Sequence, residues 1–340
     1  MTAGGTARWA GILLIGVCLS TLLAGFLAPY DPTEQDREHP YAPPSKIHFV
    51  DGAGKTQLRP FVHAWKDDGS GGYEEDPDTL VPLRVFVRGA PYKFLNVVNC
   101  HYHLVGVDAP QRIALLGTDA YGRDQLSRWL YGGQVSLMAG LLATAIALAI
   151  GLMVGLIAGY FGKRTDALLM RVAELFLAVP WLYLLLALRA FLPLRIGPFE
   201  AFLLVVLVIG AIGWARPARL IRGVVRSARH QDYVTAARSA GASHRFVLFH
   251  HVLPQTSAVL FTQAALLVPQ YILGEVTLSF FGLGVGEPVP SWGNMLQSLQ
   301  QYNVLVSYWW MLIPGLALIP LFWAFSVLAD CAQKRVEFPA

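Results

Sequence analysis

Two short stretches contain residue types that could do chemistry. Residues 51–56, DGAGKT, are similar to a phosphate-binding loop, in which backbone N–H groups surround a phosphate and a lysine neutralises it. The full pattern needs a glycine five residues before Gly54, where Phe49 stands instead. A second stretch has three residues of metal-ligating types, Cys100, His101 and His103. This single cluster lacks a fourth ligand at a recognisable spacing, so we expect no metal and no cofactor.

The remaining candidates are ionisable residues inside apolar blocks, where a charge costs several kcal/mol unless it is paired or hydrated. Glu275 stands in the run LGEVTLSFFGLG. It could line a path and meet a cationic or amino-terminal group of a solute, or it could bond to a neighbouring helix. Arg171 and Glu174 are three residues apart, on one face of a helix. We expect them to form an ion pair near the cytoplasmic interface.

The elements that must position these residues are membrane helices. The chain has 340 residues, of which 55% are hydrophobic and 14% charged, and its mean hydropathy is +0.48. Apolar blocks near twenty residues long match a hydrocarbon core of about 30 Å. The predicted blocks are 9–28, 135–160, 168–192, 199–214, 256–281 and 308–330. The sequence therefore predicts an all-α integral membrane protein with six transmembrane helices.

The segment between the first two apolar blocks differs in composition. Residues 29–130 contain many prolines and an acidic run at 74–78, which indicates an insert in water. Within it, the runs IHFV at 47–50 and PLRVFVRG at 82–89 indicate short β-strands. We divide the chain into an anchor helix at 1–28, an extracytoplasmic insert with an interfacial elbow at 29–130, and a five-helix core at 131–335 that includes a cytoplasmic loop at 216–254.

The distribution of positive charge predicts the orientation. Between Arg216 and Pro254 there are seven arginines and the single acid Asp232, whereas the loop 282–307 has neither lysine nor arginine. Lysine and arginine accumulate in short cytoplasmic loops. We therefore expect both termini in the cytoplasm and the insert outside. The net charge of +4 is modest and does not imply nucleic acid as a partner.

Residues 231–254, QDYVTAARSAGASHRFVLFHHVLP, form a hydrophilic loop with strong local signals, and we call them the coupling segment. Asp232 and Ser243 are each predicted to cap a short helix, and Gly241 to end the first helix in the left-handed conformation. Pro254 suits the first turn of the next helix, because it lacks a backbone donor. The sequence thus predicts two short helices in a bent, compact arrangement.

The coupling segment resembles the cytoplasmic loop of the permease subunits of ATP-binding-cassette importers, which carries Glu-Ala-Ala, a glycine and, further on, Leu-Pro. In that family the loop docks in a groove of the ATPase and transmits its closure to the membrane helices. Thr235 stands in place of the usual Glu, which leaves open any salt bridge from that Glu to the ATPase. The alternative interpretation is a basic segment on anionic lipid. We assign to ATPase coupling Asp232, Tyr233, Thr235, Ala236, Ala237, Gly241, Ala242, Leu253 and Pro254.

A second segment narrows the resemblance. Residues 117–137, GTDAYGRDQLSRWLYGGQVSL, are similar to the stretch before the second helix in C-type permeases for dipeptides, oligopeptides and nickel. Asp119 or Thr118 is predicted to cap a helix at the outer interface. We favour a structural elbow over direct contact with solute. The motif residues are Gly117, Thr118, Asp119, Gly122, Arg123, Asp124, Ser127 and Arg128.

Three glycines in the second apolar block form a repeated small-xxx-small pattern: Gly151, Gly155 and Gly159. Such a pattern lets two helix backbones approach closely. The sequence leaves open whether the partner helix belongs to this chain or to a second permease.

The resemblance implies a non-catalytic permease subunit with a type I importer fold in the bacterial inner membrane. It also implies partners: a second homologous permease, two ATPase subunits that hydrolyse ATP, and an extracytoplasmic solute-binding protein, all at the lipid bilayer. The implied solute is a di- or oligopeptide, with nickel or another small solute as the alternative. The competing class is a membrane-embedded enzyme acting on lipid-linked substrate. Such an enzyme needs acids, histidines or a metal triad converging near one membrane face, whereas the histidines here fall in two compartments.

Overall fold

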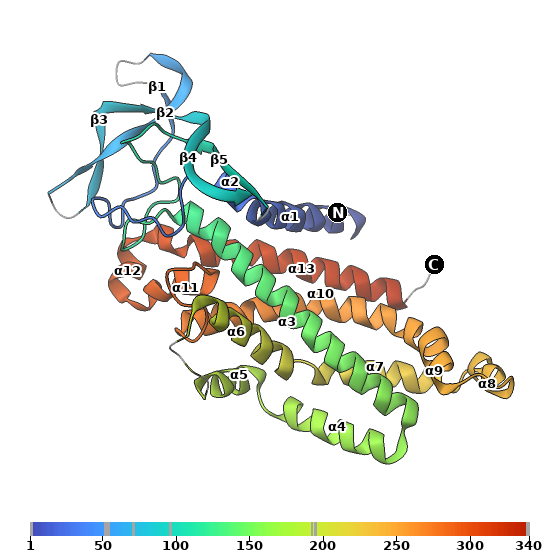
Figure 1. The fold of residues 1–340 in the computed structure, drawn as a ribbon. Helices are drawn as coiled ribbons and strands as arrows, with labels where there is room; N and C mark the ends of the chain where they lie inside the picture. Colours follow the sequence, from blue (N-terminus) through green and yellow to red (C-terminus); the bar gives the residue numbers. More distant parts are fainter. Residues whose placement is uncertain are drawn as a thin grey trace. The chain divides into compact units, whose positions relative to one another are not determined.

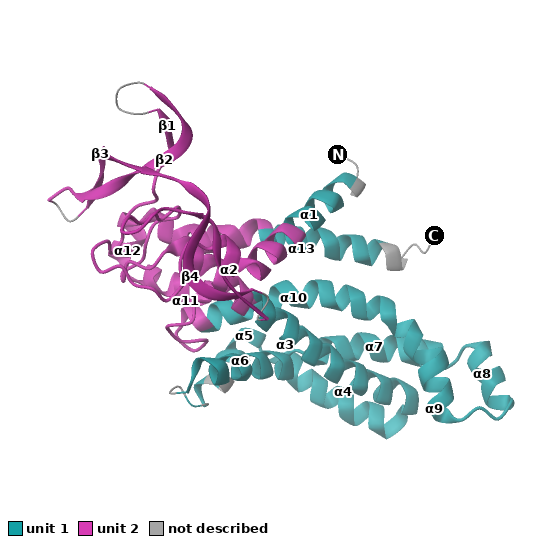
Figure 2. Cartoon of the chain, turned by 45° about the horizontal axis from the view of Figure 1, so that its top comes forward, with its two compact units in different colours: residues 1–14, 137–278, 321–340 teal, residues 15–136, 279–320 magenta. Residues whose placement is uncertain are grey.

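The computed structural model describes residues 3–50, 55–69, 72–94, 97–191, 193 and 196–337. The stretch that is similar to a phosphate loop begins with residues 51–54, which lie outside the described residues. The chain divides into two compact units (Figure 2). Unit 1 contains residues 1–14, 137–278 and 321–340, and unit 2 contains residues 15–136 and 279–320.

Four long helices contain residues of both units: α1 (Ala3–Leu22), α3 (Gln125–Phe161), α10 (Ser257–Phe280) and α13 (Ile313–Glu337) (Figure 1). By length and composition, the described residues provide four helical spans long and apolar enough to cross a membrane, or up to six if each of two bent pairs is one span. The predicted helical membrane protein is confirmed, although the chain is not all-α because its insert contains β-strands. The predicted six spans are reached only if each bent pair counts as one span.

Helices α4 (Lys163–Ala178) and α5 (Trp181–Ala190) meet at 87°, and α6 (Pro198–Ile212) and α7 (Ala215–Ala228) at 43°. The first bent pair lies in the region predicted as the third apolar block. In the second pair, α6 lies in the predicted fourth block, but α7 from Arg216 on lies within residues 216–254, which were predicted as a cytoplasmic loop. Pro180 accounts for the sharper bend, because it cannot donate a helical hydrogen bond and disfavours helical geometry at Val179, whose ψ is 131°.

The three glycines of the small-xxx-small pattern pack against α7 of the same chain, within unit 1. A Cβ added to Gly155 would lie 2.8 Å from the backbone oxygen of Ala218, and one added to Gly159 would lie 2.8 Å from that of Arg222. At Gly151 the nearest backbone oxygen, that of Trp214, would be 3.0 Å away. Side chains at these positions would force the two helices apart.

The insert in unit 2 is a β-structure. Strands β1 (His48–Val50), β2 (Thr56–Asp67) and β3 (Tyr73–Pro82) form an antiparallel sheet in that order, and β4 (Arg84–Phe94) pairs antiparallel with β5 (Val98–Gly106). The strands predicted at 47–50 and 82–89 overlap β1 and β4, whereas β2, β3 and β5 were not predicted. A small core of Val62, Val81, Val107 and Ile113 holds the insert together.

Shorter elements complete the chain. Helix α2 (Ala24–Leu27) follows α1. The coupling segment contains α8 (Asp232–Ser239) and α9 (His244–Val247), then a π-helical turn at Leu248–Val252 and a 3₁₀ turn at Leu253–Thr256 that leads into α10. Between α10 and α13 lie α11 (Trp292–Gln297) and α12 (Tyr302–Ser307).

Candidate functional site

The coupling segment has the predicted two short helices, with one cap corrected. Ser243 caps α9 by accepting a hydrogen bond from the Phe246 N–H at 3.2 Å, as predicted. Gly241 has the predicted left-handed conformation, with φ of +86°, and ends α8. The prediction that Asp232 caps α8 is wrong, because Asp232 is already the first helical residue and the cap position is Gln231. In the first turn, the Asp232 carboxylate still favours the helix through its dipole.

Helices α8 and α9 of the coupling segment lie near the end of α7 (Figure 1), and buried valines pack the segment against α3 and α7. Val234, Val247 and Val252 are fully buried, in one cluster with Ile221 and Val225 of α7. Polar contacts add to this core. The Tyr160 hydroxyl of α3 lies 2.9 Å from His244 Nδ1, and Arg229 Nη1 donates to the Tyr160 carbonyl oxygen at 2.7 Å. A force on the segment would therefore reach α3 and α7 directly.

The opposite side of the coupling segment is exposed and has many small residues. Thr235, Ala236 and Gly241 are exposed, while Ala237 and Ala242 are half-buried. At the other end of the segment Leu253 is half-buried and Pro254 exposed. Aromatic rings at Tyr233, Phe246 and Phe249 are also exposed. This surface of small and aromatic side chains could receive the surface of another protein.

The predicted ion pair between Arg171 and Glu174 is wrong. Both side chains are exposed on α4, and no ion pair joins them among the described residues. The ion pair of this helix is instead between Asp166 and Arg222 of α7, with Nε–Oδ1 and Nη2–Oδ2 distances of 2.6 and 2.5 Å. Spacing along one helix could not reveal this pair, because its partner comes from another helix.

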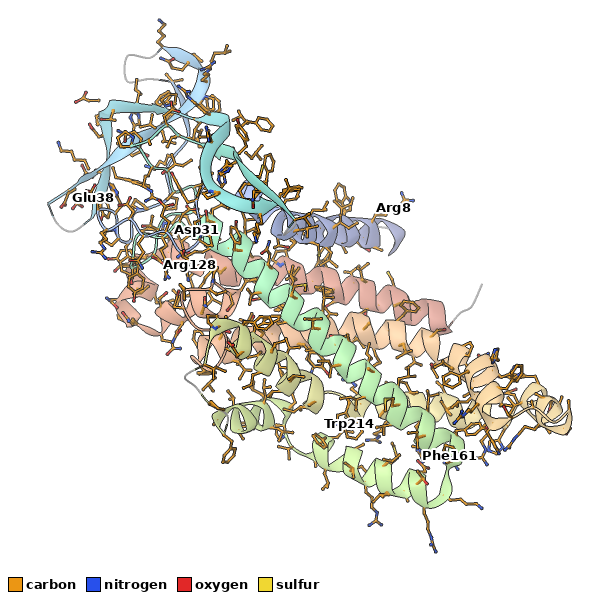
Figure 3. The ribbon with its side chains drawn as sticks, in the orientation of Figure 1. Arg8, Asp31, Glu38, Arg128, Phe161 and Trp214 are labelled. Carbon is orange, nitrogen blue, oxygen red and sulfur yellow. The ribbon has the colours of Figure 1, made fainter. Side chains whose placement is uncertain are left out.

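Arginines and carboxylates of the second motif meet Glu287 in unit 2, and we call Asp119, Arg123, Arg128 and Glu287 the elbow charge cluster. Asp119 Oδ2 accepts from Arg123 Nε at 2.7 Å. The Glu287 carboxylate accepts from Arg123 Nη1 at 2.5 Å and from Arg128 Nη2 at 3.0 Å. The Arg123 and Arg128 side chains are only 6% and 2% exposed, whereas that of Glu287 is 46% exposed. Figure 3 labels Arg128 at the start of α3.

The residue that caps α3 is Asp124, so the predicted caps Asp119 and Thr118 are wrong. Asp124 Oδ2 accepts from the Ser127 N–H at 2.7 Å and from the Ser127 hydroxyl at 2.6 Å. Asp119 instead stabilises the preceding turn, because its Oδ1 accepts from the N–H of Arg123 at 3.0 Å. An isolated β-bridge between Thr118 and Asp124 closes that turn, and α3 begins only after it, at Gln125.

The motif's other residues are engaged in backbone contacts within unit 2. The Thr118 hydroxyl donates to the His39 carbonyl oxygen at 2.7 Å, and the indole N–H of Trp310 donates to the Thr118 carbonyl at 3.0 Å. Gly117 and Gly122 have positive φ, +78° and +69°. At Gly122 a Cβ would collide with the backbone of Asp36. These contacts support a structural elbow at this motif.

The two acids beside the buried arginines have opposite pKa shifts. Burial would raise the pKa of Glu287, but the hydrogen bond from Arg123 and the charge of Arg128 outweigh it and lower that pKa. Burial raises the pKa of Asp124 from 3.8 to about 6, although hydrogen bonds from Ser127 oppose the shift. Of these two carboxyl groups, that of Asp124 therefore titrates nearer to neutral pH.

Replacing Asp124 with Asn should remove a pH dependence of stability. The raised folded-state pKa means that the folded chain binds more protons than the unfolded chain between pH 4 and 6, so stability falls as pH rises through that window. The fall is roughly 3 kcal/mol for a shift from 3.8 to about 6. Asn keeps the cap without titrating. Thermal unfolding of both purified proteins from pH 4 to 7 should show a difference that changes with pH. A constant difference would contradict the buried, raised Asp124.

Sequence reasoning missed Glu287. A signal was present, because Glu287 is the sole charged residue of the loop 282–307 while the motif before the second helix carries two arginines. Spacing alone could not pair them, because 159 residues separate Arg128 from Glu287.

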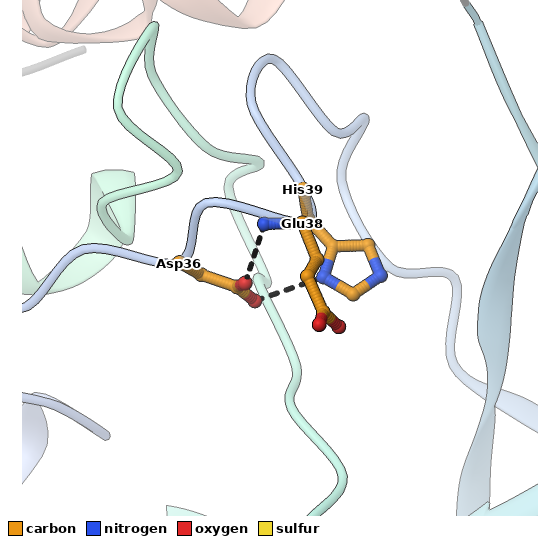
Figure 4. Close-up of side chains that lie close together, drawn as sticks. All are labelled: Asp36, Glu38 and His39. Carbon is orange, nitrogen blue, oxygen red and sulfur yellow. Dashed lines mark hydrogen bonds and ion pairs between the residues drawn. The ribbon is translucent and has the colours of Figure 1, made fainter.

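The described residues offer little for a metal. In the run that contains Cys100, His101 and His103, the His103 side chain is buried. Its ring nitrogens lie 2.6 and 3.0 Å from the backbone oxygens of Ala28 and Ala90. A different group, Asp36, Glu38 and His39, has ligand atoms within 4.8 Å of one another (Figure 4). The Asp36 carboxylate is already used there, by His39 Nδ1 at 2.8 Å and by the Glu38 N–H at 3.1 Å. These contacts make the group a local turn.

Glu275 is fully buried in α10. Burial is compatible with both expectations, a bond to a neighbouring helix and a position on a path that is closed in this conformation. Its contact with solute therefore stays a prediction.

Comparison with known proteins gives consistent matches. Residues 151–338 match the family described as binding-protein-dependent transport system inner membrane component, and residues 6–44 match the N-terminal TM domain of oligopeptide transport permease C. The chain is 32% identical over 327 residues to the di/tripeptide transport system permease protein DppC of Pseudomonas aeruginosa, which covers 96% of this chain and 85% of that protein. It is 35% identical to the oligopeptide transport system permease protein OppC of Haemophilus influenzae, over 76% of this chain and 81% of that protein.

Proposed function

The chain belongs to the family of binding-protein-dependent transport system inner membrane components, and on this premise we propose that the solute it moves is a di- or oligopeptide. It is a multi-pass permease subunit of the inner membrane. The observation that carries the peptide assignment is the similarity to a di/tripeptide permease along 96% of the chain, insert included. The nickel alternative has no comparable support among the relatives described above.

The proposed mechanism is alternating access driven through the coupling segment. Two ATP-binding-cassette ATPases bind beneath this chain and a second homologous permease, and an extracytoplasmic binding protein delivers the peptide. Closure of the ATPases on ATP pushes the exposed surface of residues 231–254. Because Val234 and Val247 lie in one core with α7, the push tilts α3 and α7. This geometry requires both termini and the coupling segment in the cytoplasm.

The substitution Gly241→Asp should leave the subunit in the membrane but abolish peptide uptake. Gly241 has φ of +86° and open space around it, so a side chain adds backbone strain and protrudes from the surface offered to the ATPase. Gly223→Asp is the matched control, because Gly223 also has open space around it but lies in α7, outside the coupling segment. Uptake of labelled tripeptide by cells and the subunit's membrane level are measured together. Normal uptake by Gly241→Asp would contradict the coupling role.

Co-purification and labelling test the assignment as a whole. A tagged chain should retain two ATPase subunits after mild detergent extraction, which a membrane-embedded enzyme does not require. In a chain whose Cys18, Cys100 and Cys331 are replaced by serine, a cysteine at exposed Ser239 should react with a thiol reagent only after the membrane is made permeable. Reaction in intact cells would place the coupling segment outside and defeat the mechanism.

A further inference from the structure

The two bent helix pairs of unit 1 meet at one cavity of about 320 Å³. The break between α4 and α5 contributes Val179, Pro180 and Trp181, and the break between α6 and α7 contributes Ile212, Gly213 and Arg216. Helix α10 supplies a third wall with Leu267, Gln270 and Tyr271. In many secondary transporters, interrupted membrane helices form the solute site, and this volume lies in the range of small-molecule pockets.

Tyr271 lines this cavity, and its hydroxyl is buried without a partner among the described residues. The whole residue is 2% exposed. Burying a hydroxyl without a partner destabilises a protein, so a site that keeps one suggests a ligand. Gly213 makes the arrangement possible, because a Cβ there would lie 1.6 Å from the Tyr271 oxygen. The second break thus leaves room for the Tyr271 hydroxyl.

The other walls combine apolar surface with one cation. Phe176, Trp181 and Leu185 line one side, and Trp181 also lies over Gly274 of α10, where a Cβ would be 3.3 Å from its ring. Arg216 lines the cavity, is exposed, and has no acidic partner among the described residues. An apolar chamber with a hydroxyl donor and a guanidinium fits a ligand with an apolar group and a carboxylate.

We propose that this cavity binds an apolar side chain of the transported peptide, and this inference rests on the proposed function. The Tyr271 hydroxyl donates to a main-chain oxygen of the peptide, and Arg216 pairs with its C-terminal carboxylate. The walls from Phe176, Trp181 and Leu185 enclose the side chain. The peptide is held at the two breaks, where a change in either bend would alter the site.

The test is photolabelling of the assembled complex of both permeases and both ATPases, without the binding protein. The probe is a dipeptide of alanine and p-benzoylphenylalanine with a free C-terminus. Label should appear on residues that line the cavity in α5 and α10. Tyr271→Phe, which removes only the hydroxyl, should weaken labelling about tenfold. Tyr183→Phe is its control, because Tyr183 is 70% exposed on the same unit and does not line the cavity.

Two further comparisons separate the parts of the site. Gly213→Ala should weaken labelling by displacing Tyr271, whereas Gly223→Ala should not, because Gly223 has open space around it. The wild-type complex should prefer the free acid to the C-terminal amide of the probe. Arg216→Gln should remove that preference, and Arg219→Gln, at an exposed position of α7 outside the cavity, should keep it.

The outcomes distinguish this inference from the proposed function. Label outside the cavity, or unchanged labelling in both Tyr271→Phe and Gly213→Ala, would overturn the inference. If the wild-type system imports peptide but its complex takes no label, the cavity is not a peptide site and the proposed function stands. If the wild-type system imports no peptide, the proposed function itself is contradicted.

Discussion

Glu287→Gln should lower the free energy of unfolding by about 3 kcal/mol, because it leaves two buried guanidiniums without their shared carboxylate. The Arg123 and Arg128 side chains are 6% and 2% exposed, so water hydrates these guanidiniums poorly, although Glu287 itself is 46% exposed. Asp119 remains, but it is 3.6 Å from Arg128 Nε and already bonded to Arg123. Thermal unfolding of the purified subunit should show a midpoint lower by several degrees.

Glu34→Gln is the matched control for this prediction. Glu34 is 45% exposed and bonds Arg112 Nη2 at 2.8 Å, so its exposure equals that of Glu287 within one percentage point. Its partner Arg112 is 24% exposed, however, and can be hydrated. The control should cost at most about 1 kcal/mol. Equal losses in the two variants would show that the buried arginines do not depend on Glu287.

Gly155→Leu should lower the free energy of unfolding by about 3 kcal/mol and prevent close packing of α3 on α7. Even a Cβ at this position would lie 2.8 Å from the Ala218 carbonyl oxygen and 2.8 Å from Ile221 Cβ. The first of these atoms is backbone and cannot move alone, so the helices must separate. Because α3 and α7 carry the core on which the coupling segment sits, peptide uptake should also be lost.

The control for the helix contact is Gly223→Leu. Gly223 lies on α7, and a Cβ there has nothing within 4 Å. Leucine should gain up to about 1 kcal/mol there through its better helix propensity. The two substitutions should therefore change thermal stability in opposite directions. If both substitutions changed thermal stability in the same direction, the close contact between α3 and α7 would not require glycine at position 155.

Local signals in the sequence predicted several features correctly. Gly241 has positive φ, as its place after a short helix indicated, and Ser243 caps the next helix. The small-xxx-small glycines do lie at a close helix contact, although only the structure identifies α7 as the partner. Each of these features depends on backbone geometry within a few residues. Such geometry is set by residue type, so a sequence can predict it.

Caps and charge pairs were harder to predict. Asp232 and Asp119 both have cap chemistry, but the cap positions lie one or more residues away, at Gln231 and Asp124. Arg222 pairs with Asp166 of another helix, and no ion pair joins Arg171 to Glu174 among the described residues. Several positions compete for each cap or ion pair. Tertiary packing decides among them.

By itself, the sequence indicated a membrane permease with an inserted segment and predicted a coupling loop at residues 231–254, because hydropathy and short motifs act within one helix or turn. The tertiary structure alone decided which distant residues meet. It brought Glu287 to Arg123 and Arg128, and it joined two helix breaks and Tyr271 around one cavity. Such contacts depend on how separate helices and loops pack. Burial removes water from their charges and hydroxyls, so leaving one of these groups without a partner costs more free energy. No spacing along the chain encodes that packing.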